Sequence, residues 1–320
     1  MKGINYILYG LTIIAMPFTK TPQTEITNGL IRATIYLPDS RKGYYRGTRF
    51  DWSGNMASLE YSGHNYFGQW FTKYSPEIHD VIMGPVEEFA PLDYPEIKPG
   101  GSFVKIGVGV VYKQDDKPYI FSRLYQLLNP GKWTVKKKSD QVLFVHDLND
   151  KAYSYHYEKN ILLIKDKPEM VLNHILINTG TRTIETNVYD HNFFVIDKHP
   201  IGPGIVVKFP FNLKGEGVGF GELAEIQGNQ ISFLRPIGNG EWAECFSLEG
   251  FGAGANDYEI RIENRITGAG VKITCDQPLL KLAFWACPTT LCPEPHIKIK
   301  VEPGKEIRWS IKYEFYTLSK

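Results

Sequence analysis

The 320-residue sequence has almost no net charge and very few cysteines. Lys and Arg together number 36 and Asp and Glu number 35, which gives a formal net charge of +1. Nucleic-acid-binding domains usually carry an excess of basic residues, so this balance argues against a nucleic-acid partner. Four cysteines occur, and none belongs to a Cys-x-x-Cys pair or stands beside a histidine cluster, which argues against a zinc site.

Motifs of dinucleotide-binding proteins and of serine hydrolases are also missing. The glycine-rich pieces that begin at Gly215 and Gly250 do not have the strand-to-helix context of a dinucleotide-binding fingerprint, so they predict turns. No Gly-x-Ser-x-Gly nucleophile elbow is present. The sequence therefore argues against both of these enzyme classes.

Only one apolar run is long enough to indicate targeting. It spans residues 4–16, follows Lys2, and is shorter than the ~20 residues that a membrane-spanning helix needs. This pattern is typical of a secretory signal, although no small-x-small cleavage site follows. A retained anchor and a buried first strand are the alternatives. We expect residues 1–20 to be a leader, residues 21–320 to form one domain without a further membrane span, and the protein to act outside the cytoplasm, periplasmic or secreted.

All four cysteines lie in the last quarter of the chain, at Cys245, Cys275, Cys287 and Cys292. An even number of cysteines in an exported protein permits disulfides. Cys287 and Cys292 bracket Pro-Thr-Thr-Leu and are close enough in sequence for a loop-closing bridge. Buried free thiols are the alternative interpretation.

Strand patterns are abundant, and helical patterns are scarce. The candidate short helices are residues 75–81 and 122–128. Strands are expected at residues 30–37, 103–112, 151–158, 161–166, 170–178, 184–190, 205–209, 230–233, 259–264, 270–275, 280–286 and 306–316. Turns are expected at Asn160 and at residues 178–181, 228–229, 238–240, 256–257 and 303–304. The pattern predicts an all-β fold, a large antiparallel β-sandwich with few short helices.

A polar cluster, Asp190-His191-Asn192, follows the strand expected at residues 184–190 and precedes Phe193 and Phe194. An imidazole near its reference pKa of ~6.5 can give and take a proton at neutral pH. A His at a strand end among polar and aromatic neighbours is suited to proton transfer to a sugar. The alternative is a His that only caps the strand or bonds a buried carbonyl.

Glu294 stands between Pro293 and Pro295. Proline restricts both its own backbone and that of the preceding residue, so the carboxylate is expected to point in one direction. A rigid and partly desolvated carboxylate is a good general base. An ordinary exposed loop glutamate is the alternative.

Taken in order, these motifs resemble the galactose-mutarotase family, which includes aldose 1-epimerases and hexose-6-phosphate epimerases. The shared pattern has an Asn-Thr-Gly turn at residues 178–180, a strand with His191 before an aromatic pair, Glu294-Pro295, and a Pro-Gly turn at residues 303–304. Each motif is weak alone, but the ordered set covers roughly residues 151–315.

The resemblance implies a galactose mutarotase-like super-sandwich that binds a mono- or oligosaccharide on a concave sheet face. It implies His191 as the general acid and Glu294 as the general base of anomer interconversion, with no metal or organic cofactor. In that scheme the carboxylate takes the proton of the anomeric hydroxyl, and the imidazolium protonates the ring oxygen.

The first half of the chain departs from the family pattern. It has neither a Leu-His-Gly-Gly-like loop nor the family's Asn/Arg sugar-binding segment. Residues 43–101 are instead rich in Tyr, Trp, His, Gly and Pro, as expected of functional loops. Arginines form forked hydrogen bonds to carboxylates, phosphates or vicinal hydroxyls, so an acidic or phosphorylated sugar is conceivable. The candidate sugar-binding residues are Arg46, Arg49, Asp51, His64, Trp70, Lys105 and Asp190.

Three functions remain open from the sequence. The first is an aldose 1-epimerase-like isomerase that uses His191 and Glu294. The second is a carbohydrate-binding protein without catalysis. The third is a domain related to polysaccharide lyases, in which Arg46 or Arg49 neutralises a uronate carboxylate. Fold analogy does not choose among them, because function depends on the site.

Overall fold

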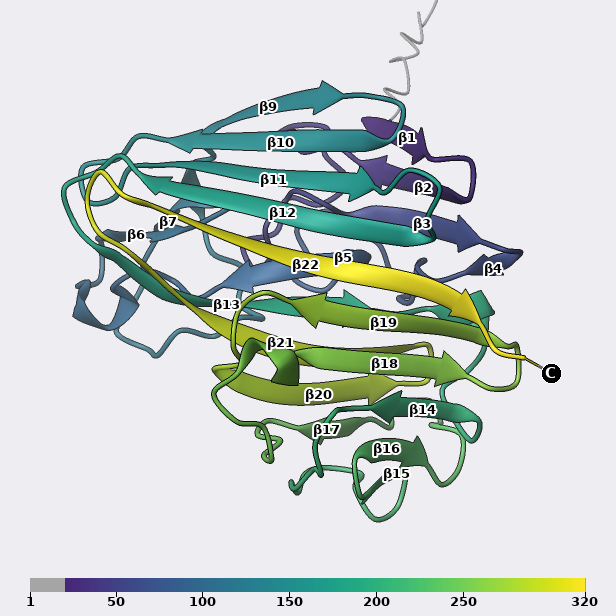
Figure 1. Cartoon of the computed structure of the whole chain (residues 1–320). Helices are drawn as coiled ribbons and strands as arrows, with labels where there is room; N and C mark the ends of the chain where they lie inside the picture. Colours follow the sequence, from purple (N-terminus) through teal and green to yellow (C-terminus); the bar gives the residue numbers. More distant parts are fainter. Residues whose placement is uncertain (1–20, 320) are drawn as a thin grey trace, which may run out of the picture.

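Antiparallel sheets stacked in layers make up residues 21–319, the part of the chain that this computed structural model describes (Figure 1). The largest is a ten-stranded sheet. Its strands, in spatial order, are β15 (Ala224–Gln227), β16 (Gln230–Phe233), β14 (Ile205–Lys208), β18 (Glu259–Asn264), β19 (Ala269–Cys275), β22 (Glu306–Thr317), β12 (Glu169–Asn178), β11 (Tyr155–Leu163), β10 (Gln141–Leu148) and β9 (Lys132–Lys137).

A five-stranded sheet lies behind the largest one in the view of Figure 1. It contains β17 (Ala243–Cys245), β20 (Lys281–Cys287), β21 (Thr290–Val301), β13 (Ile184–Phe193) and β5 (Gly84–Phe89), in that order. Two smaller sheets complete the fold. They are β1 (Gln23–Thr27), β2 (Ile31–Tyr36), β3 (Met56–Tyr61) with β4 (His64–Asn65), and β6 (Ser102–Lys105), β7 (Gly109–Tyr112) with β8 (Leu127–Asn129).

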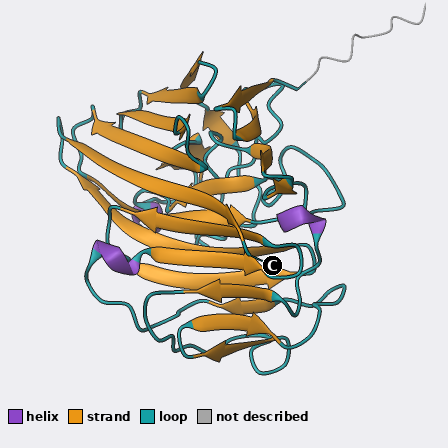
Figure 2. Cartoon of the chain, turned by 45° about the vertical axis from the view of Figure 1, so that its right-hand side comes forward, coloured by secondary structure: helices purple, strands orange, loops and turns teal. Residues whose placement is uncertain are grey.

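Helical structure in the described residues is limited to short 3₁₀ turns, so strands and loops dominate the molecule (Figure 2). These turns are η1 (Tyr94–Glu96), η2 (Ile196–Lys198) and η3 (Ala255–Asp257). None of the helices described is long and apolar enough to cross a membrane. The prediction of an all-β sandwich with few short helices is confirmed.

The two large sheets pack face to face because their strands alternate buried and less buried side chains. In β11 and β12 every second residue is buried, which is the period of a pleated strand with one face on the core. The chain passes between the two large sheets several times, for example at β12–β13 and at β21–β22. The passage from β21 to β22 turns at Gly304, whose φ of 71° suits glycine.

Three local predictions are wrong. Residues 75–81 form turns and no helix. The Pro76 carbonyl accepts a hydrogen bond from the backbone amide of Arg46 in a neighbouring loop, so it is not used in a helix. Residues 122–128 lead into β8 and form no helix. Asn160 is no turn: it pairs with Leu143 and Asn173 inside β11, so two predicted strands are one.

The strand predicted at residues 103–112 is a hairpin, β6 and β7. The chain reverses at Gly107, which has φ of 75°. A Cβ atom there would lie 2.5 Å from Oδ1 of Asp51, so only glycine fits this close approach.

The cysteines are unpaired, so the alternative of free thiols holds and the predicted bridge is wrong. The register of β20 and β21 places Cys287 opposite Thr290 and Cys292 opposite Trp285. Three of the four thiols are buried, and Cys287 is partly exposed. The predicted leader at residues 1–20 lies outside the described residues, and the division of the chain into a leader and one domain stays a prediction.

Candidate active site

One face of the five-stranded sheet forms a cavity of about 240 Å³. Its floor comes from alternate residues of adjacent strands, because residues two apart in a strand point to the same side. Loops close its rim with Phe121 and Phe246, which are 45% and 65% exposed. The lining residues are Arg49, Asp80, Phe121, Tyr189, His191, Phe193, Glu244, Phe246, Lys281, Ala283, Trp285, Glu294 and His296.

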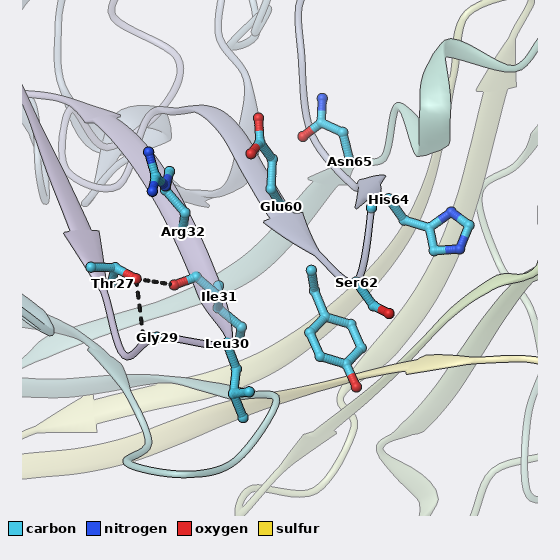
Figure 3. A pocket seen from close by; sticks show the side chains of 11 residues that line it. Thr27, Gly29, Leu30, Ile31, Arg32, Glu60, Ser62, His64 and Asn65 are labelled. Atoms are coloured by element: carbon cyan, nitrogen blue, oxygen red, sulfur yellow. Dashed lines mark hydrogen bonds between the residues drawn. The ribbon is translucent and has the colours of Figure 1, made fainter.

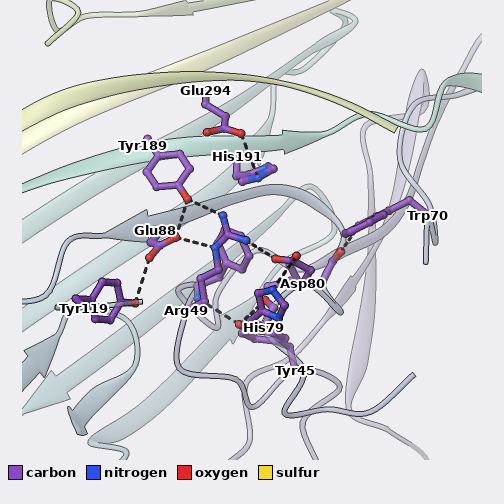
Figure 4. A network of polar contacts seen from close by, with 12 residues as sticks. Tyr45, Arg49, Trp70, His79, Asp80, Glu88, Tyr119, Tyr189, His191 and Glu294 are labelled. Atoms are coloured by element: carbon purple, nitrogen blue, oxygen red, sulfur yellow. Dashed lines mark hydrogen bonds and ion pairs between the residues drawn. The ribbon is translucent and has the colours of Figure 1, made fainter. Parts of the chain in front are cut away.

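His191 and Glu294 meet in this cavity, with Nε2 of His191 3.4 Å from Oε1 of Glu294 (Figure 4). His191 lies on β13 and Glu294 on the neighbouring strand β21. The two residues are 103 positions apart in the sequence. The structure therefore brings together the two residues that the sequence analysis proposed as the proton-transfer pair.

The local backbone differs from the sequence-based expectation at both residues. His191 lies inside β13, which continues to Phe193 because β5 pairs with it as far as Gly84. Glu294 lies inside β21 and not on a loop. The strand predicted at residues 184–190 is therefore three residues longer than expected, and the alternative of an exposed loop glutamate at position 294 is wrong.

The prolines on either side of Glu294 open a gap in the ladder between β13 and β21. Regular pairing ends at Tyr189 and His296 and returns as a bridge between Phe194 and Leu291. Proline has no N–H, so residues 293 and 295 cannot donate backbone hydrogen bonds across the gap. The side-chain amide of Asn192 donates to the Pro293 carbonyl instead, at 3.4 Å.

Aromatic side chains bury the His191 imidazole and keep it neutral. The ring stacks on Phe193 with a centroid distance of 4.0 Å and meets the edge of Phe50 at 5.4 Å, and the residue is only 3% exposed. Burial, with the nearby charge of Arg49 as a second cause, lowers the pKa of His191 well below its usual range. Nδ1 of the ring has no hydrogen-bond partner among the described residues.

Burial also keeps Glu294 partly protonated at neutral pH. It raises the pKa of Glu294 to about 7, since the opposing effect of Arg49 is smaller and Glu88 adds to the increase. Below pH ~7 the pair thus holds one dissociable proton, and that proton resides mainly on the carboxyl. This charge distribution differs from the ionised glutamate and charged imidazolium that the family resemblance implies.

Arg49 anchors the wall of the cavity through a network of buried contacts (Figure 4). Its Nε donates to Oε2 of Glu88 at 2.8 Å, its Nη2 donates to the Tyr189 hydroxyl at 3.0 Å, and its Nη1 is ion-paired with Asp80. The Tyr189 hydroxyl in turn donates to Glu88 at 2.6 Å. Two carboxylates therefore compensate the positive charge of Arg49.

Two other predicted residues lie close to the cavity without lining it. Lys105 is fully buried behind the wall, where its Nζ contacts Oε1 of Glu88 at 2.9 Å. Burial alone would raise the pKa of Glu88, but Lys105 and Arg49 lower it to about 2. Trp70 stacks on the outer side of Phe193 with a centroid distance of 5.0 Å. Both residues support side chains of the cavity and are not placed to touch a ligand in it.

Four predicted sugar-binding residues do not belong to this cavity, so their assignment to one common site is corrected. Asp51 is fully buried and accepts hydrogen bonds from Ser53. Asp190 points to the opposite face of β13 from His191, as alternation requires, and accepts a hydrogen bond from Tyr313. The remaining two, Arg46 and His64, are partly buried and line other cavities.

His64 contacts Asp197, with Nδ1 2.9 Å from Oδ2, and lines a separate hollow of about 520 Å³ between the first strands (Figure 3). Arg46 lines another surface cavity, where its Nη2 lies 3.9 Å from Oε1 of Glu77. Neither residue is among those that line the His191–Glu294 cavity.

The sequence analysis missed several residues that line the cavity. Lys281, Ala283 and Trp285 alternate along β20, and His296 follows two residues after Glu294 on β21. The alternation was a usable signal once β20 and β21 were known to be neighbours. Among residues 21–319, no group of three or more His, Cys, Asp or Glu side chains is arranged to hold a metal ion.

Comparisons with known proteins show the fold. No family model and no curated protein sequence matches the chain. A GalM/aldose epimerase homologue from C. elegans is 13% identical with a TM-score of 0.54, covering 93% of this chain and 100% of that one. A galactose mutarotase-like protein from Lactobacillus casei is 12% identical with a TM-score of 0.52, covering 92% and 100%.

A third structure, a galactose mutarotase-like protein from Clostridium acetobutylicum, is 14% identical with a TM-score of 0.53 and covers 92% of this chain and 95% of that one. At these identities the likeness is one of fold. The chain has the galactose mutarotase-like sandwich, which confirms the fold that the ordered motifs indicated.

Proposed function

We propose that this protein is a carbohydrate isomerase that interconverts the anomers of an aldose, with Glu294 and His191 as its proton-transfer pair. The observation that carries the proposal is the 3.4 Å separation of the two side chains in a cavity of about 240 Å³. Their pKa values are shifted in opposite directions, as expected of an acid and a base that act together. The fold shared with aldose epimerase homologues supports the same function.

The two groups are placed to act on two oxygens of one carbon. The anomeric hydroxyl and the ring oxygen are both bonded to C1, so protein atoms 3.4 Å apart can reach both. Neutral His191 accepts the proton of the anomeric hydroxyl, and the carboxyl of Glu294 donates its proton to the ring oxygen. The bond from C1 to the ring oxygen breaks and leaves the open-chain aldehyde.

Rotation about the C1–C2 bond and the reverse proton transfers then close the other anomer, without net gain or loss of protons. The roles are opposite to those that the family resemblance implies, because the proton of the resting pair lies on Glu294. A positioned acid or base contributes roughly 10²–10⁴-fold to such a reaction.

The cavity favours a neutral sugar over a uronate or a phosphorylated sugar. Arg49, the arginine that lines it, is already bound to Glu88 and Asp80. No arginine of the cavity is therefore free to neutralise an anionic group, which argues against the lyase alternative. Lys281 also lines the cavity, but the acidic residues Asp80, Glu244 and Glu294 line it too, so basic groups are not in excess. The exposed rings of Phe121 and Phe246 offer apolar faces on which a pyranose ring can stack.

The direct test is NMR of a freshly dissolved pure anomer. We expect catalytic amounts of the protein to speed the approach of α-glucose or α-galactose to its anomeric equilibrium, as followed from the anomeric proton signals. The matched control is the double variant His191→Ala/Glu294→Gln at the same concentration. Equal rates with the protein, with the double variant and with buffer alone, across neutral hexoses, would contradict the proposal.

The rate is expected to fall with rising pH. Glu294 has a pKa of about 7, so above that pH the pair loses its dissociable proton and the ring oxygen has no donor. The value of kcat/KM should therefore decrease about tenfold per pH unit above pH ~7, because kcat/KM reports ionisations of the free protein. A profile that is flat from pH 6 to pH 9, after subtraction of the buffer rate, would show that Glu294 is not the donor.

A further inference from the structure

A second cavity lies next to the His191–Glu294 cavity, and a third adjoins the second. The second has a volume of about 240 Å³ and the third about 560 Å³. They share the lining residues Thr48, Glu77 and Leu124, so they adjoin each other, and we call the two together the loop groove. Its walls come from the loops around residues 40–52, 75–79 and 114–127, far apart in the sequence.

The loop groove begins where the first cavity ends. Asp80 and Phe121 line the first cavity, while their chain neighbours His79 and Ser122 line the groove. The boundary between the two spaces is a contact of two side chains, His79 and Phe121, with a ring-centroid distance of 5.8 Å. Figure 4 places His79 beside Asp80 and Arg49, below the His191–Glu294 pair.

The groups that line the loop groove suit a chain of neutral sugar rings. Hydroxyl and amide groups, such as those of Ser122, Gln114 and Gln126, can bond sugar hydroxyls. Leu124 is 57% exposed and offers an apolar contact for a ring face. The basic side chain of Arg123 is ion-paired with Asp115 at 2.7 Å, so it leaves no free positive charge for an anionic polymer.

Size also favours a chain over a single sugar. Pockets for small organic ligands usually measure ~300–1,000 Å³. The first cavity alone, at about 240 Å³, is below that range, and most of the adjoining space lies in the loop groove. A monosaccharide at the His191–Glu294 pair would leave the groove without a ligand.

We propose that the ligand is a neutral oligosaccharide whose reducing-end ring occupies the His191–Glu294 cavity and whose next rings occupy the loop groove. The inference rests on the proposed function only for the placement of the reducing end. It adds a substrate class, and it gives Arg46, which lines the far part of the groove beside Glu77, a place in the binding surface.

Isothermal titration calorimetry with oligosaccharides of increasing length tests the proposal. The probes are glucose, maltose, maltotriose and maltopentaose, and the cello-series of the same lengths. We expect the Kd for at least one series to fall tenfold or more between the monosaccharide and the trisaccharide. The variants Leu124→Ala and Gln126→Ala, both at exposed positions that do not affect folding, should each weaken binding of the trisaccharide about three- to tenfold.

The matched control is Gln227→Ala, an exposed glutamine on the hairpin of β15 and β16, outside all three cavities. Monosaccharide binding should be unchanged in all three variants. If affinity does not rise with chain length, or if neither series binds, the proposal that the loop groove binds sugar rings is wrong. Affinity that rises with chain length, without anomer interconversion, would support the binding groove and contradict the proposed enzymatic function. Interconversion of monosaccharides without an effect of chain length on affinity would support the enzymatic function and contradict the binding groove.

Discussion

Replacing Glu294 by glutamine is expected to lower kcat for anomer interconversion by about 10²–10⁴-fold. The amide keeps the shape of the carboxyl and one oxygen opposite Nε2 of His191, but it has no dissociable proton for the ring oxygen. The cavity would stay intact, so KM should change little. The measurement is the rate of approach to anomeric equilibrium by NMR or polarimetry, at pH 6, where the wild-type pair is protonated.

A matched glutamate outside the cavity separates catalysis from a general effect of the substitution. Glu60 is exposed on β3 and lines the hollow of Figure 3, so Glu60→Gln should retain the wild-type rate. The Glu294→Gln variant should also lose the decrease in rate above pH ~7, because that decrease reports the ionisation of Glu294. A Glu294→Gln variant with wild-type kcat would show that the carboxyl takes no part in proton transfer.

Strands with regular alternation could be predicted from the sequence. In β22 polar and apolar residues alternate along nearly the whole strand, and the structure has this strand close to the expected bounds. The turn at Gly304 was equally visible, because Pro303 and Gly304 stand directly before the long pattern of β22. Local sequence is sufficient where one strand face is buried and the other is exposed.

Strands that are buried on both faces or contain prolines could not be predicted. β5 has the sequence Gly-Pro-Val-Glu-Glu-Phe, and all six residues are buried, although Glu87 and Glu88 suggest an exposed segment. β21 contains Pro293 and Pro295, which normally argue against a strand. Their place in the sheet depends on β20 and β13, which pair with β21 at positions far away in the sequence.

That His191 and Glu294 lie together could be predicted from the sequence, but the charge state of the pair could not. His191 and Glu294 were identified from motif order, whereas their pKa shifts depend on burial that only the folded sheets produce. For the same reason the sequence could not separate Arg49, which lines the cavity, from Asp51, which lies two residues later in the core. Charged residues near a motif are ambiguous until their surroundings are known.

The adjacent glutamates of β5 show how alternation divides one polar segment between the site and the core. Glu88 faces Arg49 and the cavity wall, while Glu87 points the other way into the space between the two large sheets. There its Oε2 lies 2.7 Å from Nζ of Lys159 and 2.8 Å from Nε2 of His174. Burial alone would raise the pKa of Glu87, but His174 and Lys159 lower it to about 2.

Replacing Lys159 by methionine is expected to destabilise the protein by about 3–5 kcal/mol, because it leaves buried carboxylates without their cation. Lys159 is fully buried, and its Nζ also lies 3.9 Å from Oδ2 of Asp51, which is fully buried too. Methionine has a similar length, so the stability that is lost comes mainly from the electrostatic interaction with the carboxylates. Urea unfolding followed by tryptophan fluorescence measures the change in the free energy of unfolding.

Two further variants distinguish a charge effect from a packing effect. Lys167→Met removes an exposed lysine whose Nζ is 4.0 Å from Glu169, and it should change stability by less than ~0.5 kcal/mol. The double variant Lys159→Met/Glu87→Gln removes both partners of the buried pair, so it should be more stable than Lys159→Met alone, since an unpaired buried charge costs more than a neutral pair. If the double variant is less stable than either single variant, the destabilisation comes from packing, and the charge balance between the sheets is not what Lys159 provides.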